Sequence, residues 1–134
     1  MRIKGRVING VDNVKGEAMV FESPFSFIGD MSPDLGTVTM SGHPLFGKSL
    51  KGKILVIPTG RGGTIAPYIA YHAKENHAAP KAILCNFADT ITLECALTID
   101  IPIMDQFPVD ITGALSTGDK VEVNVNSGYV EVFN

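Results

Sequence analysis

The stretch that decides the fold reads KILVIPTGRGGT over residues 53–64 and continues as IAPYIAY over residues 65–71. Residues 54–57 are consecutive apolar residues bounded by turn formers, a pattern typical of a strand that is covered on both faces. Thr64 is an acceptable helix N-cap, and Pro67 is tolerated in the first turn of a helix. The stretch therefore predicts a buried strand, a glycine-rich turn and a helix.

The predicted turn has the features of an anion-binding loop. Gly60, Gly62 and Gly63 carry no Cβ, so a ligand can approach their backbone closely. The N-terminus of the following helix favours anions, and Arg61 adds a planar charged group that suits carboxylate or phosphate. We expect these residues and Thr64 to bind a small anionic substrate. The alternative is a tight strand-to-helix connection with Arg61 in solvent.

The segments that follow repeat the pattern of strand and helix. Ile65, Tyr68, Ile69 and His72 fall at helical spacing and predict one face of the first helix, which Ala73 and Asn76 continue. Residues 81–85 form the next apolar run and predict a strand.

A second helix and a third strand complete this central unit. Asp89 or Thr90 can cap a helix that extends to about Leu97, and residues 101–104 predict a short strand. A strand-helix-strand-helix-strand unit favours parallel strands with a right-handed crossover, and ligands bind at the carboxyl ends of such strands. The glycine-rich turn lies at such an end.

Alternating residues predict antiparallel strands at both ends of the chain. Residues 1–8 alternate as in a half-buried strand, while residues 120–125 and 129–133 predict a β-hairpin. We therefore predict an α/β fold, with the central unit flanked by antiparallel strands, in a single domain over residues 1–134.

Three shorter segments have the composition of further strands. They are residues 17–21, 25–28 and 37–40, which are separated by glycine, proline and aspartate. The apolar residues in or near them, Phe25, Phe27, Leu45 and Phe46, suit a core or, as the alternative, a subunit interface.

Composition excludes several classes of function. The chain of 134 residues has a formal net charge of −3 and no basic cluster, which argues against nucleic-acid binding. No apolar run is long enough to span a membrane, and residues 1–6 turn polar too early for a signal peptide. We expect a cytoplasmic protein that does not bind membranes.

The cysteines and histidines do not form a metal-ligand pattern. Cys85 and Cys95 stand among apolar residues and match neither a zinc motif nor a disulfide framework, so we predict reduced core cysteines. His72 and His77 predict structural or surface roles. His43 precedes a proline in a loop, where it can fix the loop by a local hydrogen bond or reach a ligand.

An ordered set of short motifs resembles the small subunit, or swivel domain, of the aconitase X family. The motifs are FSFIG (25–29), PDLGTV (33–38), HPLFGKSLKGK (43–53), PTGRG (58–62), APKAI (79–83), AD (88–89) and IPI (101–103). Their order and spacing are similar to those of the family over most of the chain.

The resemblance implies a swivelling β/β/α domain that docks on a larger subunit, with the active site at their interface. Members of the family are hydro-lyases that dehydrate cis-3-hydroxy-L-proline or mevalonate 5-phosphate. The resemblance also implies an iron or iron–sulfur centre, which we expect in the larger subunit because two separated cysteines cannot hold a cluster. No metal ligand is therefore predicted in this chain.

The chain departs from the family at one position of the loop. The family typically has a serine after Gly-Arg-Gly, which acts as proton acceptor, whereas this chain has Gly63. Thr64 carries a hydroxyl but is displaced by one residue, or about 3.8 Å along the chain.

Three explanations follow from this departure. The complex uses Thr64 or a partner residue as base, it binds without turnover, or the chain is a non-catalytic assembly subunit. A phosphoryl-carrier domain that uses His43 is a further alternative.

Overall fold

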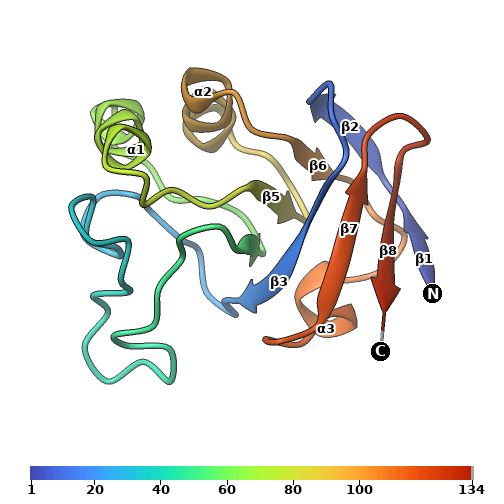
Figure 1. Ribbon diagram of the computed structural model, residues 1–134, viewed down its shortest axis with the longest axis horizontal. Coiled ribbons are helices and arrows are strands. Elements are labelled where there is room, and N and C mark those ends of the chain that lie inside the picture. The colour runs from blue at the N-terminus through green and yellow to red at the C-terminus, as the bar shows by residue number, and fades with distance from the viewer. Residues whose placement is uncertain (134) are drawn as a thin grey trace.

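The computed structural model describes residues 1–133, which form eight strands and three helices (Figure 1). In chain order these elements are β1 (Arg2–Lys4), β2 (Arg6–Asn9), β3 (Val14–Val20), β4 (Ile54–Ile57), α1 (Ala66–Glu75), β5 (Ala82–Cys85), α2 (Thr90–Ile99), β6 (Ile103–Asp105), α3 (Ile111–Ala114), β7 (Lys120–Asn124) and β8 (Tyr129–Phe133).

The central unit has the predicted parallel order. β3, β4, β5 and β6 are neighbours in that sequence, and each pairs in parallel with the next. α1 and α2 pack against one another on one side of these strands, while the hairpin of β7 and β8 lies on the other side (Figure 1). The α/β class and the flanking antiparallel strands are thus confirmed.

β4 is buried on both faces because it lies between two cores. Leu55 and Ile57 belong to the cluster that includes the inner residues of α1 and α2. Ile54 and Val56 belong to the cluster that contains the inward residues of β7 and β8. Alternate residues of a strand point to opposite faces, so an uninterrupted apolar run serves both cores.

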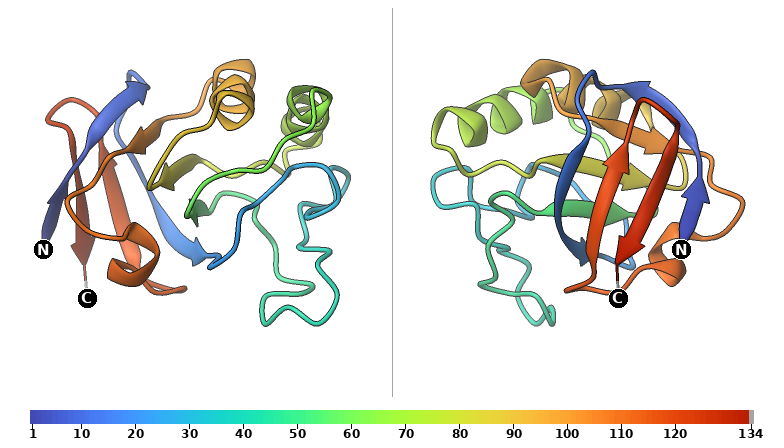
Figure 2. Two further views of the ribbon diagram at one scale, coloured as in Figure 1. Left: turned by 180° about the vertical axis from the view of Figure 1, so that it is seen from behind. Right: turned by 45° about the vertical axis from the view of Figure 1, so that its right-hand side comes forward.

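The N-terminal segment joins the two ends of the strand order. β1 pairs with β8 and β2 pairs with β6, although only Gly5 separates β1 from β2. A Cβ at Gly5 would lie 2.6 Å from Cε1 of Phe107, which explains why the smallest residue stands at this crossing. Figure 2 shows β3, β7, β8 and β1 side by side, in the order in which they pair.

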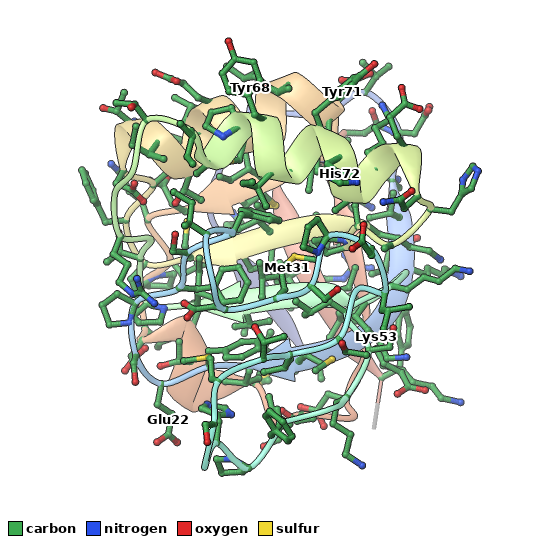
Figure 3. All side chains as sticks on the ribbon, turned by 90° about the vertical axis from the view of Figure 1, so that its left-hand side faces the viewer. Glu22, Met31, Lys53, Tyr68, Tyr71 and His72 are labelled. Atoms are coloured by element: carbon green, nitrogen blue, oxygen red, sulfur yellow. The ribbon has the colours of Figure 1, made fainter. Side chains whose placement is uncertain are left out.

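The buried face of α1 matches the predicted face only at Ala73 and, in part, at half-buried Ile69. Ala66, Ala70 and Ala73 are buried, whereas Ile65, Tyr68 and His72 are exposed. Figure 3 shows Tyr68 projecting away from the molecule. Small residues let α1 approach α2 and the sheet closely, a requirement that apolar spacing alone does not reveal.

The predicted cap of α1 is also wrong. Ile65 occupies the N-cap position without a side-chain hydrogen bond, and Thr64 lies one residue earlier. Pro67 does lie in the first turn, as predicted. α2 begins as predicted, since Asp89 accepts a hydrogen bond from the backbone N–H of Thr92.

Two of the short predicted strands are absent from the described residues. Residues 25–28 contribute one isolated bridge between Phe25 and Gly60, and residues 37–40 contribute bridges only at Thr37 and Val38. The apolar side chains of this part of the chain, such as Phe25 and Phe27, pack into the core beside α1. Its backbone does not pair with a neighbouring strand over several residues, so it is an irregular loop.

Phe25 and Phe27 are therefore core residues, while Phe46 is exposed.

The short helix α3 was not predicted. Within residues 1–133, every helix falls short of the length and apolar character that crossing a bilayer would need.

Candidate functional site

The glycine-rich loop follows β4 at the carboxyl end of the parallel strands. The carbonyl of Pro58 accepts hydrogen bonds from the N–H groups of Asn86 and Phe87, which follow β5. The hydroxyl of Thr59 donates to the carbonyl of Phe87 at 2.7 Å. The loops after β4 and β5 therefore meet at one edge of the sheet.

Gly60 is held by the start of α2. Its N–H donates to Oδ1 of Asp89 at 2.9 Å, while Oδ2 of the same carboxylate accepts from Thr92. A Cβ at Gly60 would overlap Oγ1 of Thr92 and lie 2.6 Å from Oδ1 of Asp89. Asp89 thus caps α2 and fixes the loop, and the N–H of Gly60 is already used within the chain.

Arg61 forms an ion pair instead of standing alone in solvent. Its Nη2 donates to Oδ1 and Oδ2 of Asp30 at 2.6 and 2.7 Å. The side chain of Arg61 is 53% exposed and that of Asp30 is 7% exposed. Within residues 1–133, Nε and Nη1 of Arg61 have no hydrogen-bond partner, so part of the guanidinium remains able to bind an anion.

Gly62 and Gly63 have different environments. A Cβ at Gly62 would meet no atom within 4 Å, whereas a Cβ at Gly63 would overlap Cδ1 of Ile28. Gly63 also has a φ of +127°, which side chains of L-residues rarely adopt. Its carbonyl accepts from the N–H of Ala66, which closes the turn into α1. The loop conformation therefore requires glycine at position 63.

Thr64 is exposed next to the N-terminus of α1. The structure brings Gly60, Arg61, Gly62, Gly63 and Thr64 together in one open loop. Five surface hollows in residues 1–133 are lined without any of these residues. Residues 61–64 are exposed, so the loop is open to solvent.

Asp30 and Asp89 hold the loop through contacts that were not predicted from the sequence. Asp30 is 31 positions from Arg61, and no spacing rule connects them. Asp89 was predicted to cap α2, but its contact with Gly60 was not predicted. The only available signal was the presence of an acidic residue in each adjacent loop.

The other candidate residues occupy structural positions. Nδ1 of His43 accepts from the N–H of Leu45, and its ring packs against Phe21. Cys85 and Cys95 are free and buried, and burial raises the pKa of each thiol to about 12. His72 and His77 are exposed. Within residues 1–133, no three histidine, cysteine or acidic residues are grouped so as to hold a metal ion.

A family model described as the aconitase X swivel domain matches residues 2–132. The chain belongs to the aconitase X swivel-domain family. A relative named phosphomevalonate dehydratase small subunit, from Thermococcus kodakarensis, is 43% identical over 99% of this chain and 97% of its own length. A second relative of the same name, from Methanosarcina mazei, is 39% identical over 99% of this chain and 92% of its own length.

A solved structure supports the same family membership. The crystal structure of Thermococcus kodakaraensis aconitase X in its holo-form matches with a TM-score of 0.90 and 41% identity, covering 100% of this chain and 99% of that one. The α/β arrangement described above is therefore the swivel-domain fold of the aconitase X family.

Proposed function

We propose that the chain is the small subunit of a two-subunit hydro-lyase that eliminates water from mevalonate 5-phosphate. The observation that carries this proposal is membership of the aconitase X swivel-domain family over residues 2–132, together with relatives named phosphomevalonate dehydratase small subunit. cis-3-Hydroxy-L-proline is the alternative substrate, but none of the relatives cited above is named for it. Both substrates carry a carboxylate, and mevalonate 5-phosphate also carries a phosphate.

The role of this chain is to bind the substrate anion through the loop after β4. Arg61 is the main contact, because Nε and Nη1 can donate while Nη2 stays on Asp30. Gly62 allows close approach to the backbone, since no atom lies where its Cβ would be. Gly60 and Gly63 shape the loop.

The other half of the site belongs to a larger subunit, with which this chain forms a heterodimer. The half-open geometry of residues 60–64 supports this assignment, since a small substrate is normally enclosed.

An iron or iron–sulfur centre is also assigned to the larger subunit. Cys85 and Cys95 do not fit a cluster, because both are buried on separate elements and burial raises the pKa of each thiol to about 12. Cytoplasmic location and the absence of nucleic-acid or membrane binding stay predictions.

The proton acceptor is either Thr64 or a residue of the larger subunit. Gly63 has no side chain that could exchange a proton. Thr64 is exposed beside the substrate loop, and replacing it by valine removes the hydroxyl while keeping the shape. A fall in kcat with little change in KM supports Thr64, whereas an unchanged kcat assigns the base to the partner.

Arg61→Ala tests the proposed anion contact in the reconstituted two-subunit enzyme. A charge-assisted contact contributes about 1.5 to 3 kcal/mol, so we expect KM for mevalonate 5-phosphate to rise roughly ten- to hundredfold. Steady-state kinetics of water elimination measure the effect.

Arg2→Ala is the matched control, because Arg2 is a similarly exposed arginine whose side chain pairs with Glu131 on the terminal strands. An unchanged KM for Arg61→Ala removes Arg61 from the binding site. A chain that remains monomeric in the presence of the larger subunit contradicts the subunit role itself.

A second candidate is a non-catalytic binding or assembly subunit. Gly63 in place of the family serine favours it. Restoring the serine alone is a poor test, because Gly63 has a positive φ and faces Ile28. A complex that binds mevalonate 5-phosphate calorimetrically without producing the dehydrated product would support this candidate.

A further inference from the structure

We propose that Asp30 is a positioning residue that orients Arg61 for the substrate anion. The inference rests on the proposed function, because it concerns how the loop after β4 binds its ligand. Asp30 does not touch the substrate in this view. It acts only through the guanidinium of Arg61.

Asp30 occupies a built polar site instead of a solvated surface position. The residue is 5% exposed, and its Oδ2 accepts a hydrogen bond from the N–H of Ser26 at 2.9 Å. Its own carbonyl accepts from the N–H of Thr39. A buried carboxylate is costly unless it is paired, and the pairing here comes from Arg61 and the Ser26 amide. The surrounding loop therefore holds the carboxylate in place.

The backbone of Arg61 is fixed to the same loop. Its N–H donates to the carbonyl of Phe25 at 3.0 Å, and the N–H of Phe25 donates to the carbonyl of Thr59 at 3.1 Å. Phe25 and Gly60 also form a parallel bridge. Arg61 is thus held at its backbone by Phe25 and at the far end of its side chain by Asp30.

This arrangement orders Arg61 before any ligand arrives. An arginine side chain that is free in solvent loses rotamer freedom when it binds, and prior ordering removes that cost. Asp30 engages only Nη2, so Nε and Nη1 keep their donors for an anion. The negative charge of Asp30 weakens the attraction between Arg61 and anions in general. The fixed position of the guanidinium favours an anion whose oxygens can accept from Nε and Nη1.

A double-mutant cycle in the reconstituted enzyme tests the inference. Asp30→Asn keeps the size of the side chain and an oxygen that can accept from Ser26, but removes the charge that holds Arg61. We expect KM for mevalonate 5-phosphate to rise about fivefold or more, with kcat changed less than about twofold. In the Arg61→Ala background, Asp30→Asn should cause no further rise in KM.

Asp34→Asn is the matched control. Asp34 is an exposed carboxylate in the same irregular loop, and its partner is His72 rather than Arg61. This variant removes one negative charge from the loop without affecting the guanidinium, so we expect an unchanged KM.

The outcomes separate the two proposals. If Asp30→Asn raises KM equally with and without Arg61, Asp30 has a merely structural role and the inference is overturned. It is also overturned if Arg61→Ala raises KM and Asp30→Asn does not. If Arg61→Ala leaves KM unchanged, the proposed binding function of the loop fails, and the inference fails with it.

A second measurement needs no substitution at Asp30. The side-chain NMR signals of Arg61 in the full chain should show hindered rotation of the guanidinium before substrate is added. Rotation as free as that of an arginine in an unfolded peptide would contradict prior ordering by Asp30.

Discussion

The three glycines of the loop after β4 have different environments. Gly60 leaves room for Asp89 and Thr92, Gly62 lies in open space, and Gly63 provides a positive φ beside Ile28. The first supports the junction with α2, and the third closes the turn into α1. Only Gly62 has no structural requirement within the described residues, so its small size is available for ligand approach.

Gly60→Ala and Gly62→Ala should therefore differ in stability. At position 60 the new methyl group would displace Thr92 or Asp89, and overpacking of this kind costs about 1–3 kcal/mol. At position 62 we expect a change within about 0.5 kcal/mol. Urea denaturation of both variants measures the free energies of unfolding. Equal stability would contradict the close contact between Gly60 and α2.

The helices differ in how their N-termini are satisfied. Asp89 caps α2 and Asp110 caps α3, whereas Ile65 at the start of α1 provides no side-chain acceptor. The first N–H groups of α1 are thus without a side-chain cap, next to the loop that carries Arg61. Sequence spacing predicted the helix itself, because apolar residues recur at its period, but it assigned Thr64 to a capping role that the structure does not show.

Asp110, which caps α3, has a pKa that can be tested by mutation. Hydrogen bonds, foremost from the Asn86 side chain, hold the pKa of Asp110 below its ordinary value of 3.8. Because this pKa is lowered in the folded protein, the hydrogen bonds to ionised Asp110 stabilise the folded state above pH 3.8. This stabilisation is lost as the pH falls through the folded-state pKa of Asp110. Asn86→Ala should raise the pKa of Asp110 toward 3.8, as measured by NMR titration of its carboxyl carbon.

The control for this titration is Glu131 in the same variant. Its pKa is lowered mainly by a hydrogen bond from Arg2, away from Asn86, and should stay the same in both proteins. An unchanged pKa of Asp110 in Asn86→Ala would show that Asn86 does not stabilise the charged cap.

At the scale of the whole molecule, the structure consists of two hydrophobic cores and a long irregular loop between β3 and β4. β4 and β5 are fully buried between the helices and the hairpin, so their amides are shielded on both faces. Residues 41–49 are mostly exposed, while residues 60–65 form the rim at the carboxyl end of β4. The buried centre therefore carries an exposed rim.

Hydrogen exchange of the chain with and without the larger subunit tests this division. Amides of β4 and β5 should exchange most slowly, and those of residues 41–49 should exchange quickly. Binding of the larger subunit should slow exchange in residues 60–65, because the proposed shared site is closed there. The turn between β7 and β8 serves as control. Unchanged exchange in residues 60–65 on binding would place the interface elsewhere.

The sequence by itself determined the local elements. The apolar run of β4, the cap of α2 and the alternation of β7 and β8 all depend on neighbours within a few positions, so they could be predicted. The tertiary structure decided which face of α1 is buried. It also decided that residues 25–28 form a loop and that Arg61 pairs with Asp30. These features depend on contacts between distant residues, and the Arg61–Asp30 pair spans 31 positions.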